Sequence, residues 1–239
     1  MINSMLYYFL LFLIYAFAGW IMEVILFLVK EKKFINRGFL IGPYCPIYGF
    51  CAVLMVLTFD KLTSTPFTLF IMAAFVCTFF EYITSYIMEK LFNARWWDYS
   101  QVSFNINGRV CLHNSILFGL LGLFIIYIAN PFVEGLISQI PSDILPIISG
   151  ILLVLFIIDN IISFNIISRV RTTTNAVIKD NTEEITEKVK NILLNRSLLS
   201  KRLIESFPNL KLVIEERLKE QKEKLIEQTE KIKEKINRE

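Results

Sequence analysis

The chain has 239 residues, of which 54% are hydrophobic and 20% are charged, and its formal net charge is +3. This composition is more apolar than that of a typical soluble domain, and the small net charge gives no reason to expect nucleic-acid binding. The charges gather at one end, because 17 of the 25 lysines and arginines lie in residues 169–239. Continuous apolar runs in the rest favour helices over the alternating strands of a membrane barrel. The sequence therefore predicts an all-α, polytopic membrane helix bundle.

Five apolar runs are long enough to serve as membrane-spanning helices, and they predict about five crossings. They cover residues 6–29, 39–57, 66–88, 111–128 and 144–167. The second run is short and contains Gly42, Pro43, Pro46 and Gly49. It is either a helix whose first turn carries prolines or a segment that starts as irregular, re-entrant backbone.

Basic residues alternate between the loops and predict the direction of each helix. The first and third loops hold four and three lysines or arginines, the second holds only Lys61, and the fourth holds none. The tail begins with Arg169 and Arg171. Because positively charged loops stay in the cytoplasm, we expect an outside N-terminus, a cytoplasmic tail and a place in the bacterial cytoplasmic (inner) membrane.

Three carboxylates lie inside apolar runs, Glu23 in the first, Glu81 in the third and Asp159 in the fifth. At 1.5 Å per residue, each lies about 9 to 12 Å from the cytoplasmic end of its helix. Charged groups at membrane depth usually face the bundle interior or water. The sequence therefore predicts a polar, carboxylate-lined cavity open to the cytoplasm. The alternative is a set of internal ion pairs that only hold the helices together, although buried ion pairs are poor stabilisers.

Other polar side chains enter from the same side and complete the predicted substrate-binding or coupling site. Arg37 and Arg109 precede the second and fourth helices. The loop after the third helix is rich in aromatic residues, and Asn107-Gly108 predicts a tight turn in it. This loop forms either a lid over the cavity or part of an interfacial aromatic belt. The remaining predicted site residues are Tyr44, Tyr82, Trp97, Asp98, Asn107, His113, Asn114 and Asn160.

Metal, cofactor and ATP-binding sites are not predicted. His113 is the only histidine, and the four cysteines lack C-x-x-C spacing, so we interpret them as buried apolar residues. Cys111 and His113 could bind a metal together with a carboxylate, but their spacing is not diagnostic of a metal site. The sequence also lacks the G-x-x-x-x-G-K-[ST] phosphate loop. These features favour a protein that is not itself an enzyme.

The chain is predicted to divide into a transmembrane domain over residues 1–170 and a cytoplasmic tail over residues 171–239. In the tail, Leu218, Leu225 and Ile232 are seven residues apart amid Glu/Lys pairs. This heptad-like stripe is typical of a coiled coil, and it predicts contact with a partner helix or with a second copy of the chain. A solvated single helix is the alternative.

Several motifs occur together in residues 5–165. They are Gly19-Trp20-x-x-Glu23, the run Arg37-Gly38-Phe39-Leu40-Ile41-Gly42-Pro43-Tyr44-Cys45-Pro46-Ile47-Tyr48-Gly49, Glu81-Tyr82, Trp96-x-Asp98-Tyr99-Ser100 and Asn107-Gly108-Arg109. With these motifs the chain resembles the bacterial type IV ABC-transporter permease family, and the run at 37–49 is the most specific part. The resemblance implies a small polytopic membrane protein of the permease class.

The leading interpretation is a membrane transport protein, either a permease or a permease subunit. Its expected partners are the lipid bilayer, a separate ATPase subunit and, because five helices are few for a carrier, further copies of the chain. Two alternatives remain. One is a membrane anchor or scaffold that recruits partners through its tail, and the other is an intramembrane enzyme acting on a lipid substrate. Only an enzyme would turn over its substrate in detergent, without a sealed compartment.

Overall fold

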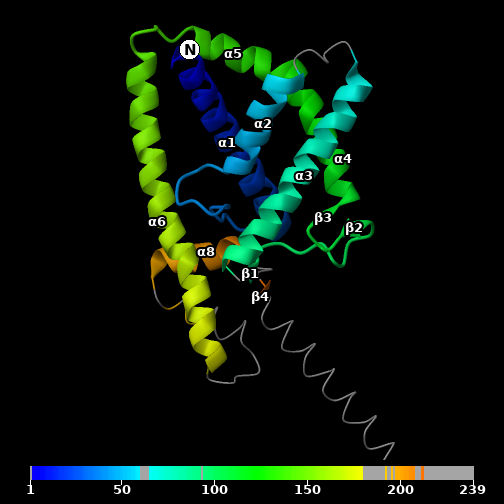
Figure 1. Ribbon diagram of the computed structural model, residues 1–239, viewed down its shortest axis with the longest axis vertical. Coiled ribbons are helices and arrows are strands. Elements are labelled where there is room, and N and C mark those ends of the chain that lie inside the picture. Colours follow the sequence, from blue (N-terminus) through cyan, green and yellow to red (C-terminus); the bar gives the residue numbers. More distant parts are fainter. Residues whose placement is uncertain are drawn as a thin grey trace, which may run out of the picture.

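The computed structural model of the protein describes residues 2–59, 65–92, 94–179, 192, 195, 197–207 and 211–212. Its main body is a bundle of helices that run between two ends (Figure 1). One end carries the N-terminus and α5 (Asn130–Ser138), and we call it the N-terminal end. The other carries α8 (Leu198–Ser206), and we call it the α8 end. Lys61 and the heptad-like stripe predicted in the tail lie outside the described residues.

In the described part of the chain, four helical segments are long and apolar enough to cross a membrane. They belong to α1 (Ile2–Glu31), α3 (Pro66–Phe92), the succession from α4 (Leu112–Phe124) to α5, and α6 (Leu145–Lys179). Five residues of π-helix, η2 (Ile125–Ala129), connect α4 to α5. The axis turns there, so that α5 lies across the N-terminal end of the bundle (Figure 1). Bends of this kind are typical of π-helical insertions.

The remaining apolar helix of the bundle, α2 (Pro46–Phe59), has only 14 residues. At 1.5 Å per residue it rises about 21 Å, which is less than the ~30 Å of a bilayer's hydrocarbon core. The apolar run predicted at 39–57 is helical only from Pro46, and residues 39–45 are irregular. The bundle therefore combines four long apolar segments with one short helix that follows irregular backbone.

Glycines bring two pairs of helices into close contact, α1 with α2 and α3 with α4. A Cβ atom at Gly49 would overlap the backbone oxygen of Phe12 on α1. A Cβ atom at Gly122 would overlap the side chain of Ala73 on α3. Apolar side chains gain little when they leave lipid for another helix, so close backbone approach is a main source of attraction between membrane helices.

Large apolar side chains cover the outside of the bundle. Phe75 on α3, Ile128 on η2 and Ile151 on α6 are 67%, 61% and 58% exposed. Exposed apolar surface of this extent marks contact with lipid or with another protein. Together with the four long apolar segments, it makes this the fold of a multi-pass membrane protein.

The buried apolar residues form two clusters. The larger cluster fills the space between α1, α2, α3 and α5, where Leu11 and Met55 are almost completely buried. The second cluster lies at the α8 end and is rich in aromatic rings, among them Phe92 and Trp96. The second cluster joins α3 and α6 to the tail.

Two further contacts illustrate how the tail is attached to the bundle. Phe207, which follows α8, stacks on Phe39 with the ring centroids 4.5 Å apart. β4 (Lys211–Leu212) pairs antiparallel with β1 (Ala94–Arg95), directly after α3. α6 is continuous through residue 170, where the domain boundary was predicted, and ends at Lys179.

A short hairpin precedes α4. It consists of β2 (Asn105–Ile106) and β3 (Val110–Cys111), which pair antiparallel. Asn107 and Gly108 at its tip have φ angles of 54° and 66°. Asn and Gly are the residues that most readily adopt such left-handed conformations, in agreement with the predicted tight turn.

Candidate functional site

A cavity of about 630 Å³ lies inside the bundle. All the long helices line it, together with α2, the irregular segment before α2 and Phe207 of the tail. Its wall is apolar toward the N-terminal end, at Met55 and Val133, and again toward the α8 end, at Phe92 and Phe164. Between these apolar regions, the wall contains the polar side chains of Glu23, Arg37, Tyr48, Glu81, Trp97 and Tyr99.

Glu23 on α1 supplies one carboxylate of the wall. The hydroxyl of Tyr48 donates a hydrogen bond to its Oε1 at 2.5 Å, and Arg37 Nε lies 3.6 Å from its Oε2. Gly19, one helical turn before Glu23, leaves room for the Tyr48 ring, which a Cβ atom there would overlap. The charge of Glu23 is therefore balanced by a nearby guanidinium.

Glu81 on α3 supplies the second carboxylate, and it is only 8% exposed. Tyr99 donates a hydrogen bond to its Oε1 at 3.3 Å, whereas Oε2 is buried and finds no hydrogen-bond partner in the described part of the chain. Burial and the nearby Glu81 charge raise the pKa of Tyr99 well above its ordinary value, so Tyr99 stays protonated and remains a donor. Asn114 is a further polar neighbour of this carboxylate. Among the described residues, no lysine, arginine or histidine forms an ion pair with Glu81.

Asp159 on α6 faces the irregular segment before α2 and does not line the cavity. Backbone N–H groups without a helical partner are costly at membrane depth, and Asp159 accepts two of them. Arg202 on α8 lies near the same carboxylate: burial lowers the Arg202 pKa, and Asp159 opposes that effect. The four groups that donate to Asp159 are the N–H of Ile41 (3.0 Å), the N–H of Gly42 (2.7 Å), the hydroxyl of Ser163 (2.7 Å) and the hydroxyl of Tyr44.

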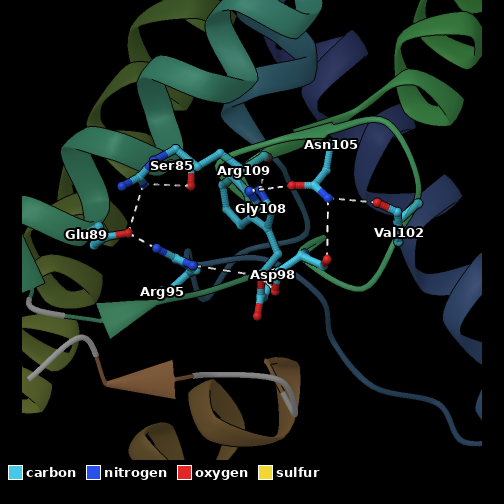
Figure 2. Close-up of polar contacts among 10 residues, drawn as sticks. Ser85, Glu89, Arg95, Asp98, Val102, Asn105, Gly108 and Arg109 are labelled. Atoms are coloured by element: carbon cyan, nitrogen blue, oxygen red, sulfur yellow. Dashed lines mark hydrogen bonds and ion pairs between the residues drawn. The ribbon is translucent and has the colours of Figure 1, made fainter. Parts of the chain in front are cut away.

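Arg109 lies beside the cavity, in a network of charges that Figure 2 shows. Its Nη1 lies 2.9 Å from Glu89 Oε2, and the same oxygen lies 3.2 Å from Arg95 Nε. Arg95 Nη1 in turn lies 3.8 Å from Asp98 Oδ1. Two guanidinium groups thus face two carboxylates. The network is electrically balanced, and it joins α3 to the loop that follows.

This loop folds back against α3 and α4 and contributes Trp97 and Tyr99 to the cavity wall. The indole N–H of Trp97 donates to the carbonyl oxygen of Arg109 at 3.0 Å, which fixes the ring. Farther out, the Asn107 amide donates to the Tyr82 hydroxyl at 2.9 Å. The predicted aromatic loop is therefore a wall of the cavity as well as a connection between helices.

Five of the predicted site residues line the cavity, and the others lie around it. Asp98 accepts hydrogen bonds from Ser100, and His113 is exposed at the start of α4. Within the described ranges, no group of three or more His, Cys, Asp or Glu residues is placed to hold a metal ion. The five residues in the wall are Glu23, Arg37, Glu81, Trp97 and Asn160.

Comparison with known proteins identifies the family. The sequence model of the family described as "Putative ABC-transporter type IV" matches residues 10–164. The chain belongs to this family. No curated protein and no solved structure matches the chain.

The ABC-transporter type IV match covers almost the whole site. All cavity-lining residues except Ile167 and Phe207 lie within it. The match confirms the resemblance that the motifs at 19–23 and 37–49 carry, and with the four long apolar segments it supports a multi-pass membrane protein related to ABC transporters.

Two further residues, Ser85 and Glu89, belong to the network at Arg109 but were not predicted from the sequence. With Cys77 and Glu81 they recur every four residues on α3, a spacing that places side chains on one face of a helix. This four-residue period is the signal by which the sequence could have indicated Ser85 and Glu89 as neighbours of Glu81. Near the end of an apolar run, Glu89 looks like an ordinary interfacial charge.

Proposed function

We propose that this protein is a permease subunit of a membrane transporter, and that the cavity in its bundle binds the transported solute. The observation that carries the proposal is the position of Glu23 and Glu81, which come from different helices and face one cavity of about 630 Å³. Carboxylates at membrane depth are costly, and they usually mark substrate or ion pathways. Membership of a family described as ABC-transporter type IV supports the same function.

The energy source in this proposal is a separate ATPase subunit. The sequence has no phosphate-binding loop of its own, so ATP hydrolysis would occur on a partner. The tail packs on the α8 end of the bundle, through Phe207 and through the pairing of β4 with β1. A partner that contacts the tail is therefore in a position to move the elements around the cavity at the α8 end of the bundle.

The proposed entrance is at the α8 end, on the cytoplasmic side in the orientation that the basic loops predict. Phe207 lines the cavity there, is 7% exposed and packs against Phe39 and Trp96. Withdrawal of α8 would remove this ring from the wall and open the cavity. The loop with Trp97 and Tyr99 is the adjoining lid in this proposal.

The proposal is tested by purifying the tagged chain from its native membranes in mild detergent and identifying the proteins that remain bound. We expect an ATPase subunit in stoichiometric amount, and ATP hydrolysis by the complex in proteoliposomes. Ala129 lines the cavity, so Ala129→Trp should narrow it and impair transport while the ATPase stays bound. Gly150→Trp is the matched control, because no atom of the described residues lies within 4 Å of a Cβ atom there.

Absence of an ATPase from native preparations contradicts the ATP-driven version of the proposal. Equal activity of Ala129→Trp and Gly150→Trp contradicts the assignment of the cavity as the solute site. Turnover of a lipid by the purified chain in detergent, without a sealed compartment, identifies an enzyme instead.

A further inference from the structure

On the basis of the proposed function, we infer that the cavity takes an apolar organic monocation, with its positive charge beside Glu81 and its apolar body against the cavity wall. Two observations lead to this class of ligand. One is the balance of charge around the cavity, and the other is the composition of the wall.

Of the two carboxylates in the cavity wall, Glu81 is the one without an ion pair to any described residue. Glu23 faces Arg37 at 3.6 Å, and Glu89 faces Arg109 at 2.9 Å. Asp159 accepts four hydrogen bonds. Glu81 accepts one such bond, from Tyr99, with Asn114 as a further polar neighbour, and no ion pair reaches it from the described residues.

The free oxygen of Glu81 is the point at which a ligand would bind. Within the described ranges Oε2 is buried without a hydrogen-bond partner, in a side chain that is 8% exposed, and Glu81 belongs to the cavity wall. A buried polar atom without a partner is unfavourable, and a cation placed in the cavity would remove that cost. One uncompensated carboxylate calls for one positive charge.

The wall excludes a hydrated inorganic ion as the preferred occupant. As a whole it consists mainly of apolar and aromatic side chains, which offer few ligands to replace the water of a small ion. An organic cation carries less tightly held water, and its apolar surface is stabilised by the same side chains. Aromatic rings in the wall, such as those of Trp97 and Phe118, also attract cations.

The inference is tested with two ions of the same shape and opposite charge, tetraphenylphosphonium and tetraphenylborate. The full chain is purified in an uncharged detergent, and binding of each radiolabelled ion is measured by equilibrium dialysis against protein-free micelles. We expect saturable binding of one phosphonium ion per chain and much weaker binding of the borate. Glu81→Gln should weaken phosphonium binding about tenfold or more, because the charge that the ligand faces is lost.

Three measurements control for folding and for nonspecific charge effects. Glu81→Gln should elute in gel filtration and melt like the native protein. Glu81→Asp keeps the charge and should retain more affinity than Glu81→Gln. Glu205→Gln removes a carboxylate whose side chain is 48% exposed on α8, and it should bind the phosphonium ion normally.

Equal binding of the two ions, or full affinity in Glu81→Gln, overturns the inference even if an ATPase copurifies with the chain. Saturable, Glu81-dependent binding without an ATPase supports the inference and contradicts the ATP-driven function. The two proposals therefore fail in distinguishable ways.

Discussion

Asp159 and Glu81 are both carboxylates within the helical bundle, but their surroundings differ. Asp159 accepts hydrogen bonds from two backbone N–H groups and two hydroxyls. Glu81 accepts a hydrogen bond from Tyr99 and has Asn114 nearby, and its second oxygen is buried beside a cavity with no hydrogen-bond partner among the described residues. The first arrangement stabilises an irregular stretch of backbone, whereas the second leaves an acceptor for a ligand. A carboxylate at membrane depth therefore has to be interpreted from its partners and not from its depth alone.

Glu89 is an intermediate case between these two. Its carboxylate is buried on the same helix face as Glu81, but Arg109 and Arg95 balance its charge. A carboxylate with more partners should contribute more to stability. Substitutions of the carboxylates or of their partners test this, and we give them from the largest expected effect to the smallest.

Asp159→Ala should destabilise the protein most. It removes the acceptor of the Gly42 N–H and of the Tyr44 hydroxyl, whereas the N–H of Ile41 keeps Ser163 Oγ at 3.1 Å. Unsatisfied buried donors cost about 1–3 kcal/mol each. We expect the free energy of unfolding in detergent to fall by about 3 kcal/mol. Denaturant unfolding followed by circular dichroism measures this. The exposed Asp143→Ala is the control, and equal stability of the two variants would remove Asp159 from its structural role.

Arg109→Met should have the next largest effect. Glu89 would keep Arg95 at 3.2 Å but lose its closer ion pair to Arg109. We therefore expect the free energy of unfolding to fall by about 2 kcal/mol, which is less than the cost of a fully unpaired buried charge. A double-mutant cycle with Glu89→Gln measures the coupling. Additive effects of the two substitutions would show that the pair is not coupled.

Tyr44→Phe removes one of the four donors to Asp159 and keeps the ring. We expect the free energy of unfolding to fall by about 1 kcal/mol, the usual net contribution of one hydrogen bond, because three donors remain. Melting temperature in detergent is a sufficient measurement. Tyr86→Phe, at a ring that is 44% exposed, is the control and should melt like the native protein. A loss as large as that of Asp159→Ala would mean that the other three hydrogen bonds contribute little.

Glu81→Gln should change stability least. The substitution removes a charge with no counterion among the described residues, so we expect the free energy of unfolding to stay within about 0.5 kcal/mol of the native value or to rise. The same denaturant unfolding experiment applies, with Glu205→Gln as reference. Destabilisation comparable to that of Asp159→Ala would make Glu81 a structural residue and would end the contrast between the two carboxylates.

Several features of the fold could be predicted because they depend on local sequence. Apolar runs indicate where α1, α3, α4 and α6 lie, since about 20 apolar residues are needed to cross lipid as a helix. The turn at Asn107-Gly108 follows from the left-handed conformations that these two residues tolerate. The motifs at 19–23 and 37–49 indicate the family.

Partners of the predicted site residues could not be predicted in the same way. Equal depth suggested one cavity for Glu23, Glu81 and Asp159, but depth along a helix does not give the direction of a side chain around it. The structure directs Glu23 and Glu81 into the cavity wall, and Asp159 toward Ile41 and Gly42. Segments more than 100 residues apart in the sequence meet at this point, and no local pattern encodes their contact.

By itself, therefore, the sequence determined the apolar segments, the polar residues within them and the family. Composition and periodicity act over neighbouring residues, and these properties need no knowledge of packing. Only the tertiary structure decided that α8 returns to the bundle, that Phe207 lines the cavity, and that Glu81 has a free oxygen. Each of these depends on which side chains from distant segments fill the space around a group, and that is settled when the helices pack.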